Sequence, residues 1–307
     1  VLTAAVLAFS LTACEKHTHD YAAVWSKDAT YHWHAATCEH TDEVKDKAEH
    51  SFYSGLCTVC GYQTADYPKG LRFKFNPDEN AYCVTGLGTC KDTNLVIPFE
   101  FQGLPVIGIG DKAFYVNTSL KSITLPDSVT NIGDYAFSGC TSLSDINIPD
   151  GVTSIADYAF SNCTSLTSIT IPDGVTSIGE RAFYGCASLS GINIPEGVTS
   201  IADFTFSNCI SLTSITIPEG VTSIGFSTFY GCTSLHSVGF HDNITRIGVN
   251  AFDKCYALTL EETNQDNPYN LPVSLTTLGE CAFQNCTGIT RVCLPEGVTV
   301  VPRYAFN

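Results

Sequence analysis

Thiol and imidazole side chains that could bind a metal are concentrated near the start of this 307-residue chain. Cys57 and Cys60 form a Cys-x-x-Cys-Gly knuckle, which lets two thiolates converge on one tetrahedral ion. Two further ligands would come from upstream, and we assign them to Cys38 and His50, with His40 as a substitute. Because a segment this small builds little core, a metal would supply the missing folding energy. The sequence therefore predicts a zinc-ribbon-like, His/Cys-rich module over residues 25–66 that holds one structural zinc.

The same cysteines are compatible with two other chemistries. A disulfide between Cys38 and either Cys57 or Cys60 would suit an exported protein. Redox catalysis by the knuckle would need a βαβ pattern around it, and the sequence shows none there. Zinc and the disulfide both stay open, and the spacing favours zinc.

The elements that would position functional residues follow a repeat. An Ala-Phe or Thr-Phe pair begins at residues 113, 136, 159, 182, 205, 228, 251, 282 and 305, so every step except one is 23 residues. A period between 20 and 29 residues is typical of a leucine-rich-repeat solenoid. The exceptional step is 31 residues, and its eight extra residues fall within 261–270.

The segment 166–186 shows the physics of one rung. Thr170 points outward between Ile169 and Ile171, which is the period of a strand, and Pro172 ends that strand because it cannot donate to a ladder. The chain then turns back inward, and Phe183 stands at the start of a return segment for which we expect one helical turn. Stacked rungs would bury each apolar column against its own copies. We therefore expect a parallel sheet with strands about 4.8 Å apart.

The motif L-x-x-I-x-I-P-x-x-V-x-x-I-x-x-x-A-F-x-x-C stands almost unaltered in residues 143–163 and 166–186. It resembles the BspA-type leucine-rich repeats of bacterial surface proteins, and the resemblance extends from about Tyr82 to the end of the sequence. The resemblance implies a repeat solenoid, display at the cell surface, and a role in binding rather than catalysis.

The first residues resemble the export signal of a bacterial lipoprotein. Residues 1–13 are apolar or small, and Leu-Thr-Ala-Cys14 is similar to a lipobox. That resemblance implies a diacylglycerol on Cys14, a truncated lipoprotein signal peptide over residues 1–13, and a polar tether over residues 14–24. No later stretch approaches the roughly 20 apolar residues that span a bilayer, so we expect an anchored protein rather than a spanning one.

A cap is expected between the metal-binding module and the solenoid. In residues 67–105, the alternating stretch 71–75 and the stretch 81–84 flank a turn and predict a β-hairpin. The end of a solenoid needs such a cover over its core. The solenoid itself would occupy residues 106–307, and we expect it to be C-terminally truncated because no polar closing unit follows its last Phe.

A longer period lies within the repeat. Residues 141–163 match residues 187–209 at 18 of 23 positions, whereas the adjacent rungs 141–163 and 164–186 match at 15. The sequence therefore indicates duplication of a two-rung unit of 46 residues.

The strand face carries the candidate ligand-binding residues. Asn147 and Asn193 alternate with Thr170 and Thr216 along its outward column and align hydrogen-bonding groups over several rungs. A ligand that uses them would be extended or repetitive and would gain avidity from several weak contacts. A compact ligand would instead need a unique feature, and only the insertion at 261–270 supplies one.

Three further columns repeat with the rungs. We interpret the cysteine column as stacked, buried thiols without chemistry. One acidic column follows the strand, and we expect it to face water rather than divalent cations. The other acidic column precedes the Ala-Phe pairs, where a carboxylate can cap a short helix. The members are, in that order, Cys140, Cys163, Cys186, Cys209, Cys232, Cys255 and Cys286; Asp127, Asp150, Asp173, Glu196, Glu219, Asp242 and Glu296; and Asp134, Asp157, Glu180, Asp203 and Glu280.

Composition excludes several functions. The chain has 15 Lys and Arg against 31 Asp and Glu, a formal charge of −16, which argues against a nucleic acid partner. It has no Gly-x-x-x-x-Gly-Lys loop, His-Glu-x-x-His or Gly-x-Ser-x-Gly motif, so we do not expect an enzyme. We expect a lipid-anchored, adhesion-type protein on the outside of the bacterial cell envelope that binds a protein or glycan ligand. The alternative is a structural spacer that presents a missing C-terminal module.

Overall fold

The computed structural model describes residues 68, 70–260 and 271–307 in full, and the backbone of residues 26–27, 31–35, 44–49, 52–53 and 56–57. The chain divides into two compact units, Val1–Thr64 and Ala65–Asn307. All elements in the described residues are strands, and none is a helix.

The first unit contains two small sheets. Antiparallel strands β1 (Ser26–Lys27), β2 (Tyr31–Ala35) and β3 (Val44–Glu49) form one sheet in that order, and β4 (Phe52–Tyr53) pairs with β5 (Leu56–Cys57) in the other. Cys57 is the last residue of β5, whereas Cys38, His50 and Cys60 lie outside the described residues. The zinc site therefore stays a prediction.

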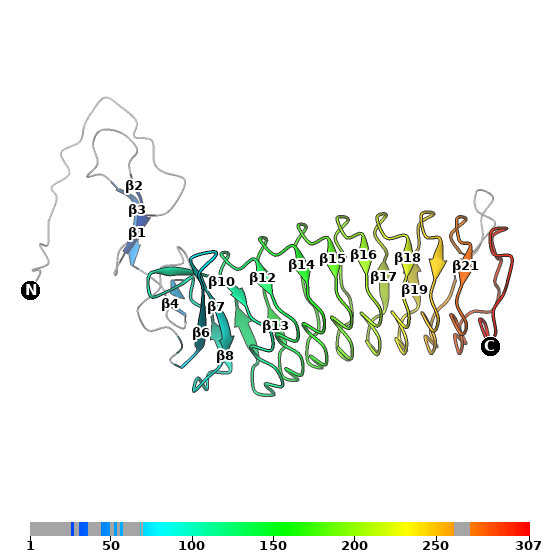
Figure 1. Ribbon diagram of the computed structural model, residues 1–307, viewed down its shortest axis with the longest axis horizontal. Coiled ribbons are helices and arrows are strands. Elements are labelled where there is room, and N and C mark those ends of the chain that lie inside the picture. The colour runs from blue at the N-terminus through cyan, green and yellow to red at the C-terminus, as the bar shows by residue number, and fades with distance from the viewer. Residues whose placement is uncertain are drawn as a thin grey trace, which may run out of the picture. The chain divides into compact units, whose positions relative to one another are not determined.

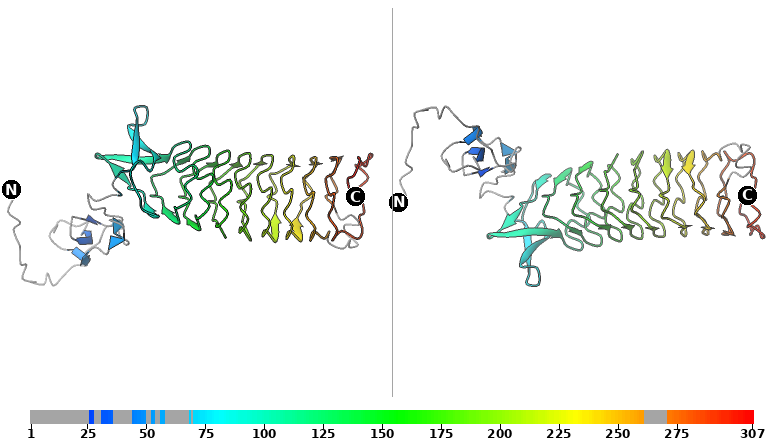
Figure 2. Two further views of the ribbon diagram at one scale, coloured as in Figure 1. Left: turned by 90° about the horizontal axis from the view of Figure 1, so that it is seen from below. Right: turned by 90° about the horizontal axis from the view of Figure 1, so that it is seen from above.

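The second unit begins with the predicted hairpin. Strands β6 (Arg72–Asn76) and β7 (Ala81–Gly86) pair antiparallel, and the hairpin projects from the side of the solenoid (Figure 2). Strand β7 also pairs in parallel with β10 (Leu104–Ile109), which has β9 (Glu100–Phe101) on an antiparallel path beside it. Because Val84 of β7 lies in the solenoid core and Phe73 of β6 packs against it, the hairpin starts the stack of rungs.

The predicted parallel pairing along the Leu-x-x-Ile-x-Ile segments is present, but it is interrupted. Between its two sheets, Thr170 and Asn193 form a single parallel bridge. The first sheet contains β8 (Asn94–Val96), β11 (Ser122–Thr124) and β13 (Asp145–Ile146), and the second contains β17 (Ser214–Thr216) and β19 (Ser237–Gly239). We call this row the first ladder.

A second parallel ladder forms in the Val-Thr-Ser-Ile segments. For these segments the sequence indicated only a turn back toward the core. The strands of this ladder are two residues long, too short for a period of two to show in the sequence. They are β12 (Asn131–Ile132), β14 (Ser154–Ile155), β15 (Ser177–Ile178), β16 (Ser200–Ile201), β18 (Ser223–Ile224), β20 (Arg246–Ile247) and β21 (Thr277–Leu278), and they repeat from rung to rung along the solenoid (Figure 1).

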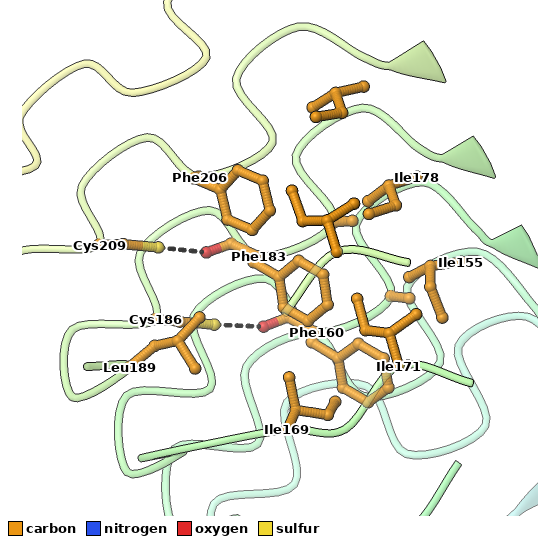
Figure 3. Packing of buried hydrophobic residues seen from close by; sticks show 14 of the residues in the cluster. Ile155, Phe160, Ile169, Ile171, Ile178, Phe183, Cys186, Leu189, Phe206 and Cys209 are labelled. Atoms are coloured by element: carbon orange, nitrogen blue, oxygen red, sulfur yellow. Dashed lines mark hydrogen bonds between the residues drawn. The ribbon is translucent and has the colours of Figure 1, made fainter. Parts of the chain in front are cut away.

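The Phe column forms the centre of the core. From Phe114 to Phe306 the rings of successive rungs stack nearly parallel, with centroids 5.1–5.6 Å apart, and Figure 3 shows three of them. The isoleucines of both ladders and the leucines after the cysteine column pack around this stack. One continuous hydrophobic core therefore runs through the rungs.

The expected helical turn at Phe183 is wrong. Arg181 has a left-handed φ of 52°, and its equivalents in the other rungs also have a positive φ, which an α-helix excludes. The backbone N–H of Phe183 donates to the carbonyl of Thr205 in the next rung at 2.9 Å instead of to its own segment. Bonds between rungs therefore alternate with local turn bonds, such as that from the N–H of Tyr184 to the carbonyl of Arg181 at 3.1 Å, and no helix forms in this segment.

The cysteine column is buried, as expected, and it also donates hydrogen bonds. Cys186 Sγ lies 3.1 Å from the carbonyl of Phe160, and Cys209 Sγ lies 3.2 Å from that of Phe183 (Figure 3). Burial raises the pKa of the Cys186 thiol to about 12. The whole column repeats this bond, so each thiol ties its rung to the preceding one and has little nucleophilic character.

Candidate functional site

The four candidate ligand-binding residues all lie exposed in the first ladder. Thr216 ends β17, Asn147 directly follows β13, and Thr170 and Asn193 form the bridge between the two sheets. The structure therefore places them one rung apart in a single column, as the period requires. Ligand binding by these residues stays a prediction.

Asn147 already makes two hydrogen bonds within the solenoid. Its Nδ2 donates to the carbonyl of Leu125 at 3.0 Å, and its Oδ1 accepts from the N–H of Leu125 at 2.8 Å. The side chain thus continues the ladder beyond the end of β13. One N–H and one lone pair stay available to a ligand, so Asn147 is the most constrained of the four residues.

A second row of exposed hydroxyls stands on the second ladder, and the sequence reading did not single it out. Its threonines recur once per rung, and some of their hydroxyls bond to the preceding rung, as Thr245 Oγ1 does to the carbonyl of Thr222 at 3.2 Å. Their recurrence in the Val-Thr-Ser-Ile motif was the available signal. The row contains Thr130, Thr153, Thr176, Thr199, Thr222, Thr245 and Thr276.

The acidic column that follows the strand is exposed from Asp127 to Asp242. Near its end, Glu219 accepts from Nδ2 of Asn243 at 2.8 Å and lies 3.7 Å from Nδ1 of His241. Within the part of the chain that the structure describes, no three His, Cys, Asp or Glu residues come together as a metal site.

The other acidic column caps turns, but not those of its own rung. Asp157 Oδ1 accepts from the backbone N–H of Glu180 in the next rung at 2.7 Å, and Asp203 Oδ1 accepts from that of Phe226 at 2.7 Å. No helix is capped, so the sequence expectation holds only for the capping chemistry.

Each of these caps requires glycine in the rung that it covers. A Cβ on Gly179 would lie 2.5 Å from Asp157 Oδ1, and one on Gly225 would lie 2.4 Å from Asp203 Oδ1. The intervening rung carries Ala202 at this position. The two types of rung therefore fit each other in alternation.

A second alternation follows the Phe column. A Cβ on Gly185 would lie 2.5 Å from Oδ1 of Asn162, and Gly231 stands in the same relation to Asn208. Steric complementarity at both columns gives the 46-residue period found in the sequence a physical cause.

A groove of about 520 Å³ lies between the hairpin and the first rung. Lys74, Cys83 and Asp111 line it, together with the exposed ring of Phe75. Burial raises the pKa of Cys83, so its thiol is not activated as a nucleophile. The groove therefore lacks the feature that a cysteine-dependent enzyme would need.

Besides the zinc site, two sequence predictions fall on residues that the structure leaves undescribed: lipidation at Cys14 and a role for the insertion at 261–270. Within the described ranges, no helix is long and apolar enough to cross a membrane.

The stacked rungs, the parallel ladders and the Phe column define a leucine-rich-repeat solenoid. A family model described as BspA type Leucine rich repeat region matches residues 107–212, 153–266 and 259–307, with six copies of the repeat. The chain belongs to this family, as its sequence motif implied. Among curated proteins, none matches.

Several solved structures are similar to the chain. A leucine-rich repeat protein of T. pallidum shares 35% identity over 62% of this chain and 88% of that one, with a TM-score of 0.58. A leucine rich cell surface protein from Faecalibacterium prausnitzii A2-165 shares 29% identity over 78% and 84% of the two chains, with a TM-score of 0.37. A leucine-rich repeat protein from Bacteroides ovatus shares 21% identity over 75% and 94%, with a TM-score of 0.35.

Proposed function

We propose that this chain is a lipid-anchored bacterial surface protein that binds a protein or glycan ligand through its solenoid. The observation that carries the proposal is the exposed first-ladder column, which repeats the same polar groups over a continuous buried core. Membership of the BspA-type family supports a binding or adhesion role at the cell surface.

An extended ligand suits this column. Thr170, Asn193 and Thr216 offer hydroxyl and amide groups one rung apart, and no single rung provides an enclosed site at these residues. Each contact would be weak, and several made together would give avidity. The ligand class is therefore a polymer or an extended polypeptide with its own repeat.

A pull-down of the chain from matrix proteins and polysaccharides identifies the ligand, and two double variants then test the column. Thr170→Val with Thr216→Val should weaken binding severalfold, because both remove hydroxyls from the first ladder. The matched control is Thr176→Val with Thr222→Val, which removes exposed hydroxyls from the second ladder. Equal losses in both pairs would contradict a site on the first ladder.

Deletions separate an extended ligand from a compact one. Removing residues 187–232, one two-rung unit that includes Asn193 and Thr216, should weaken binding severalfold while the fold survives. Removing residues 261–268 should change binding little. The reverse result would move the site to the insertion.

Lipidation at Cys14 anchors the protein in this proposal. Labelled palmitate supplied to an expressing bacterium should enter the wild type but not Cys14→Ser. Equal labelling of both proteins would remove the anchor from the proposal without affecting ligand binding.

One zinc in residues 25–66 is the remaining proposal, with Cys38, His50, Cys57 and Cys60 as ligands. Elemental analysis of the chain should find one equivalent of zinc, which Cys57→Ser with Cys60→Ser should lose. Cys281→Ser is the matched control within the solenoid. Absence of metal together with a cross-link from Cys38 to Cys57 or Cys60 would establish the disulfide instead.

A structural spacer is the second candidate, and the bonded state of Asn147 favours it. The amide of Asn147 is bonded to the neighbouring strand, so at this position the column stabilises the solenoid. An enzymatic or anchoring domain in the full-length downstream sequence would support the spacer, as would failure of every ligand in the pull-down.

A further inference from the structure

Five aromatic rings and one arginine line one turn of the solenoid over six successive rungs. Tyr135, Tyr158, Arg181 and Phe204 each stand directly before an Ala-Phe or Thr-Phe pair, and Tyr115 and Phe226 extend the row at its two ends. We call these six residues the ring row.

The ring row is one continuous chain of contacts. Tyr115 meets Tyr135 edge to face at 6.2 Å, and Tyr135 stacks on Tyr158 with centroids 4.3 Å apart. Arg181 then lies 5.4 Å from the ring centroid of Tyr158 and 4.0 Å from that of Phe204, which meets Phe226 at 5.0 Å.

The turn itself does not require these rings. Tyr158 and Phe204 hold left-handed φ angles of 57° and 58°, a conformation that costs about 1–2 kcal/mol for a residue with a side chain. Ser227 and Asn250 occupy the same position in the next two rungs with φ angles of 50° and 55°. Because these rungs form the same turn without a ring, backbone geometry does not explain the aromatic side chains.

The ring row already binds a cation of its own chain. Arg181 is held between two rings, and Glu180 pairs with its guanidinium. Lys112 likewise lies 5.4 Å from the ring centroid of Tyr135. The row therefore shows the geometry by which a ring and a neighbouring carboxylate hold a guanidinium or an ammonium group.

The ends of the row have no such cation. Tyr115 is 52% exposed and Phe226 is 39% exposed, and neither is among the cation–π pairs found in the described residues. Between residues 122 and 245 the sequence has eleven Asp and Glu but Arg181 as its sole Lys or Arg, so the Phe226 end of the row lies in a strongly acidic stretch. At the Tyr115 end, Lys112 lies over the ring of Tyr135 instead of over that of Tyr115.

We propose that the ring row binds an arginine- or lysine-rich segment of a partner protein. Guanidinium groups would stack on the exposed faces of Tyr115 and Phe226, while the exposed carboxylates of Asp134, Asp157 and Asp203 complement their charge. This surface differs from the first-ladder column, so the proposal goes beyond the function proposed above and is tested independently of it.

Calorimetric titration of the whole chain with a nine-arginine peptide, a nine-lysine peptide and a nine-acetyl-lysine peptide tests this surface. The arginine peptide should bind more tightly than the lysine peptide, since its planar group stacks on rings, and the neutral peptide should not bind. Affinity should fall as salt rises, because exposed charges are screened.

A pair of ring variants separates the row from a general acidic field. Tyr115→Ser with Phe226→Ser should weaken arginine-peptide binding about fivefold or more, because two exposed cation–π contacts are lost. Ile210→Ser with Tyr256→Ser is the matched control, since both residues are 46% exposed and lie outside the row. If the serine pair lowers the melting temperature, Tyr115→Leu with Phe226→Leu replaces it and keeps apolar bulk without a ring.

Three results would overturn the proposal. One is the absence of peptide binding. Another is a salt-sensitive binding that ring variants leave unchanged or that both variant pairs weaken equally. The third is tighter binding of a neutral oligosaccharide that the ring variants abolish, which would assign the row to a glycan.

Discussion

The Phe column and the glycine–alanine column of the solenoid repeat on different periods. Phe160 and Phe183 sit in adjacent rungs, both fully buried and each stacked between equivalent rings. Gly179 and Ala202 also occupy one column in adjacent rungs. The carboxylate of Asp157, from the preceding rung, folds over Gly179. The corresponding acidic residue in the rung before Ala202 is Glu180. The core thus repeats every 23 residues and the turn contacts every 46.

The difference shows what selects each period. A flat ring stacks on its own copy, so the core imposes no alternation. A carboxylate that folds over the next rung needs an empty space there, and glycine provides it. Duplication of two-rung units keeps these pairs matched, whereas duplication of single rungs would not.

Alkaline pH should produce the largest effect, and it acts on the core through the cysteine column. Burial raises the pKa of Cys140, Cys186, Cys232 and Cys286 from 9.0 to about 12. The folded state then binds more protons than the unfolded state above pH 9, so stability is complete below that pH and falls as pH rises. At pH 10 each of these thiols should cost about 1.4 kcal/mol, or roughly 6 kcal/mol for the four.

Urea unfolding at pH 8 and pH 10 measures this loss. A double variant, Cys186→Ala with Cys232→Ala, should show a smaller difference between the two pH values than the wild type, although it is less stable at pH 8. Identical pH dependence in both proteins would assign the alkaline loss to other groups.

Truncating a residue of the Phe column should lower the free energy of unfolding by nearly the same amount in either type of rung. Phe160→Ala and Phe183→Ala should each lower the free energy of unfolding by about 3–5 kcal/mol, the usual range for a buried Phe. Thermal or urea unfolding measures both. A large difference between the two variants would show that the 46-residue period extends into the core.

Deletions should reveal the turn period directly. Removing residues 164–186 places Ala202 beneath Asp157 and Asn208 beside Asn162, where glycines stood before. Each of these two clashes should cost about 1–3 kcal/mol, as overpacking does. Removing residues 187–232 keeps the rung types in alternation, so this longer deletion should be the more stable protein despite its smaller core.

A single methyl group gives the smallest test. Gly179→Ala should lower stability by about 1–3 kcal/mol, because its Cβ would meet the Asp157 carboxylate. The matched control Ala202→Gly should cost less, about 0.5–1 kcal/mol, from chain entropy alone. Restoration of Gly179→Ala by Asp157→Ala would identify the carboxylate as the cause, and no gain would exclude it.

The sequence predicted the columns that face their own copies, because identical residues recur there at a fixed interval. Phe160, Cys186 and Ile169 are buried as expected, and the first ladder lies where the alternation of Ile169 and Ile171 placed it. The second ladder escaped prediction because a two-residue strand carries no periodic signal.

The turn contacts escaped prediction for a different reason. Residues such as Tyr158 and Arg181 adopt a left-handed conformation. Their residue types do not predict it, since glycine and asparagine are the usual residues in that conformation. Pairing across rungs imposes the conformation, so it appears only in three dimensions. The four candidate ligand residues lie exposed in one column, and their role stays a prediction. The two hydrogen bonds between Asn147 and Leu125 also had no signal in the sequence.

In the cysteine column, disulfide formation competes with the stacking of rungs during folding. Each thiol of the column is accessible in the unfolded chain and becomes inaccessible once its rung packs on the next one. Disulfide formation takes seconds to hours, and neighbour-to-neighbour contacts of the kind that join these rungs form faster than long-range ones. In oxidising surroundings, a chain that stacks its rungs promptly keeps every thiol of the column reduced, whereas a delayed chain acquires cross-links that remove the thiol hydrogen bonds between rungs.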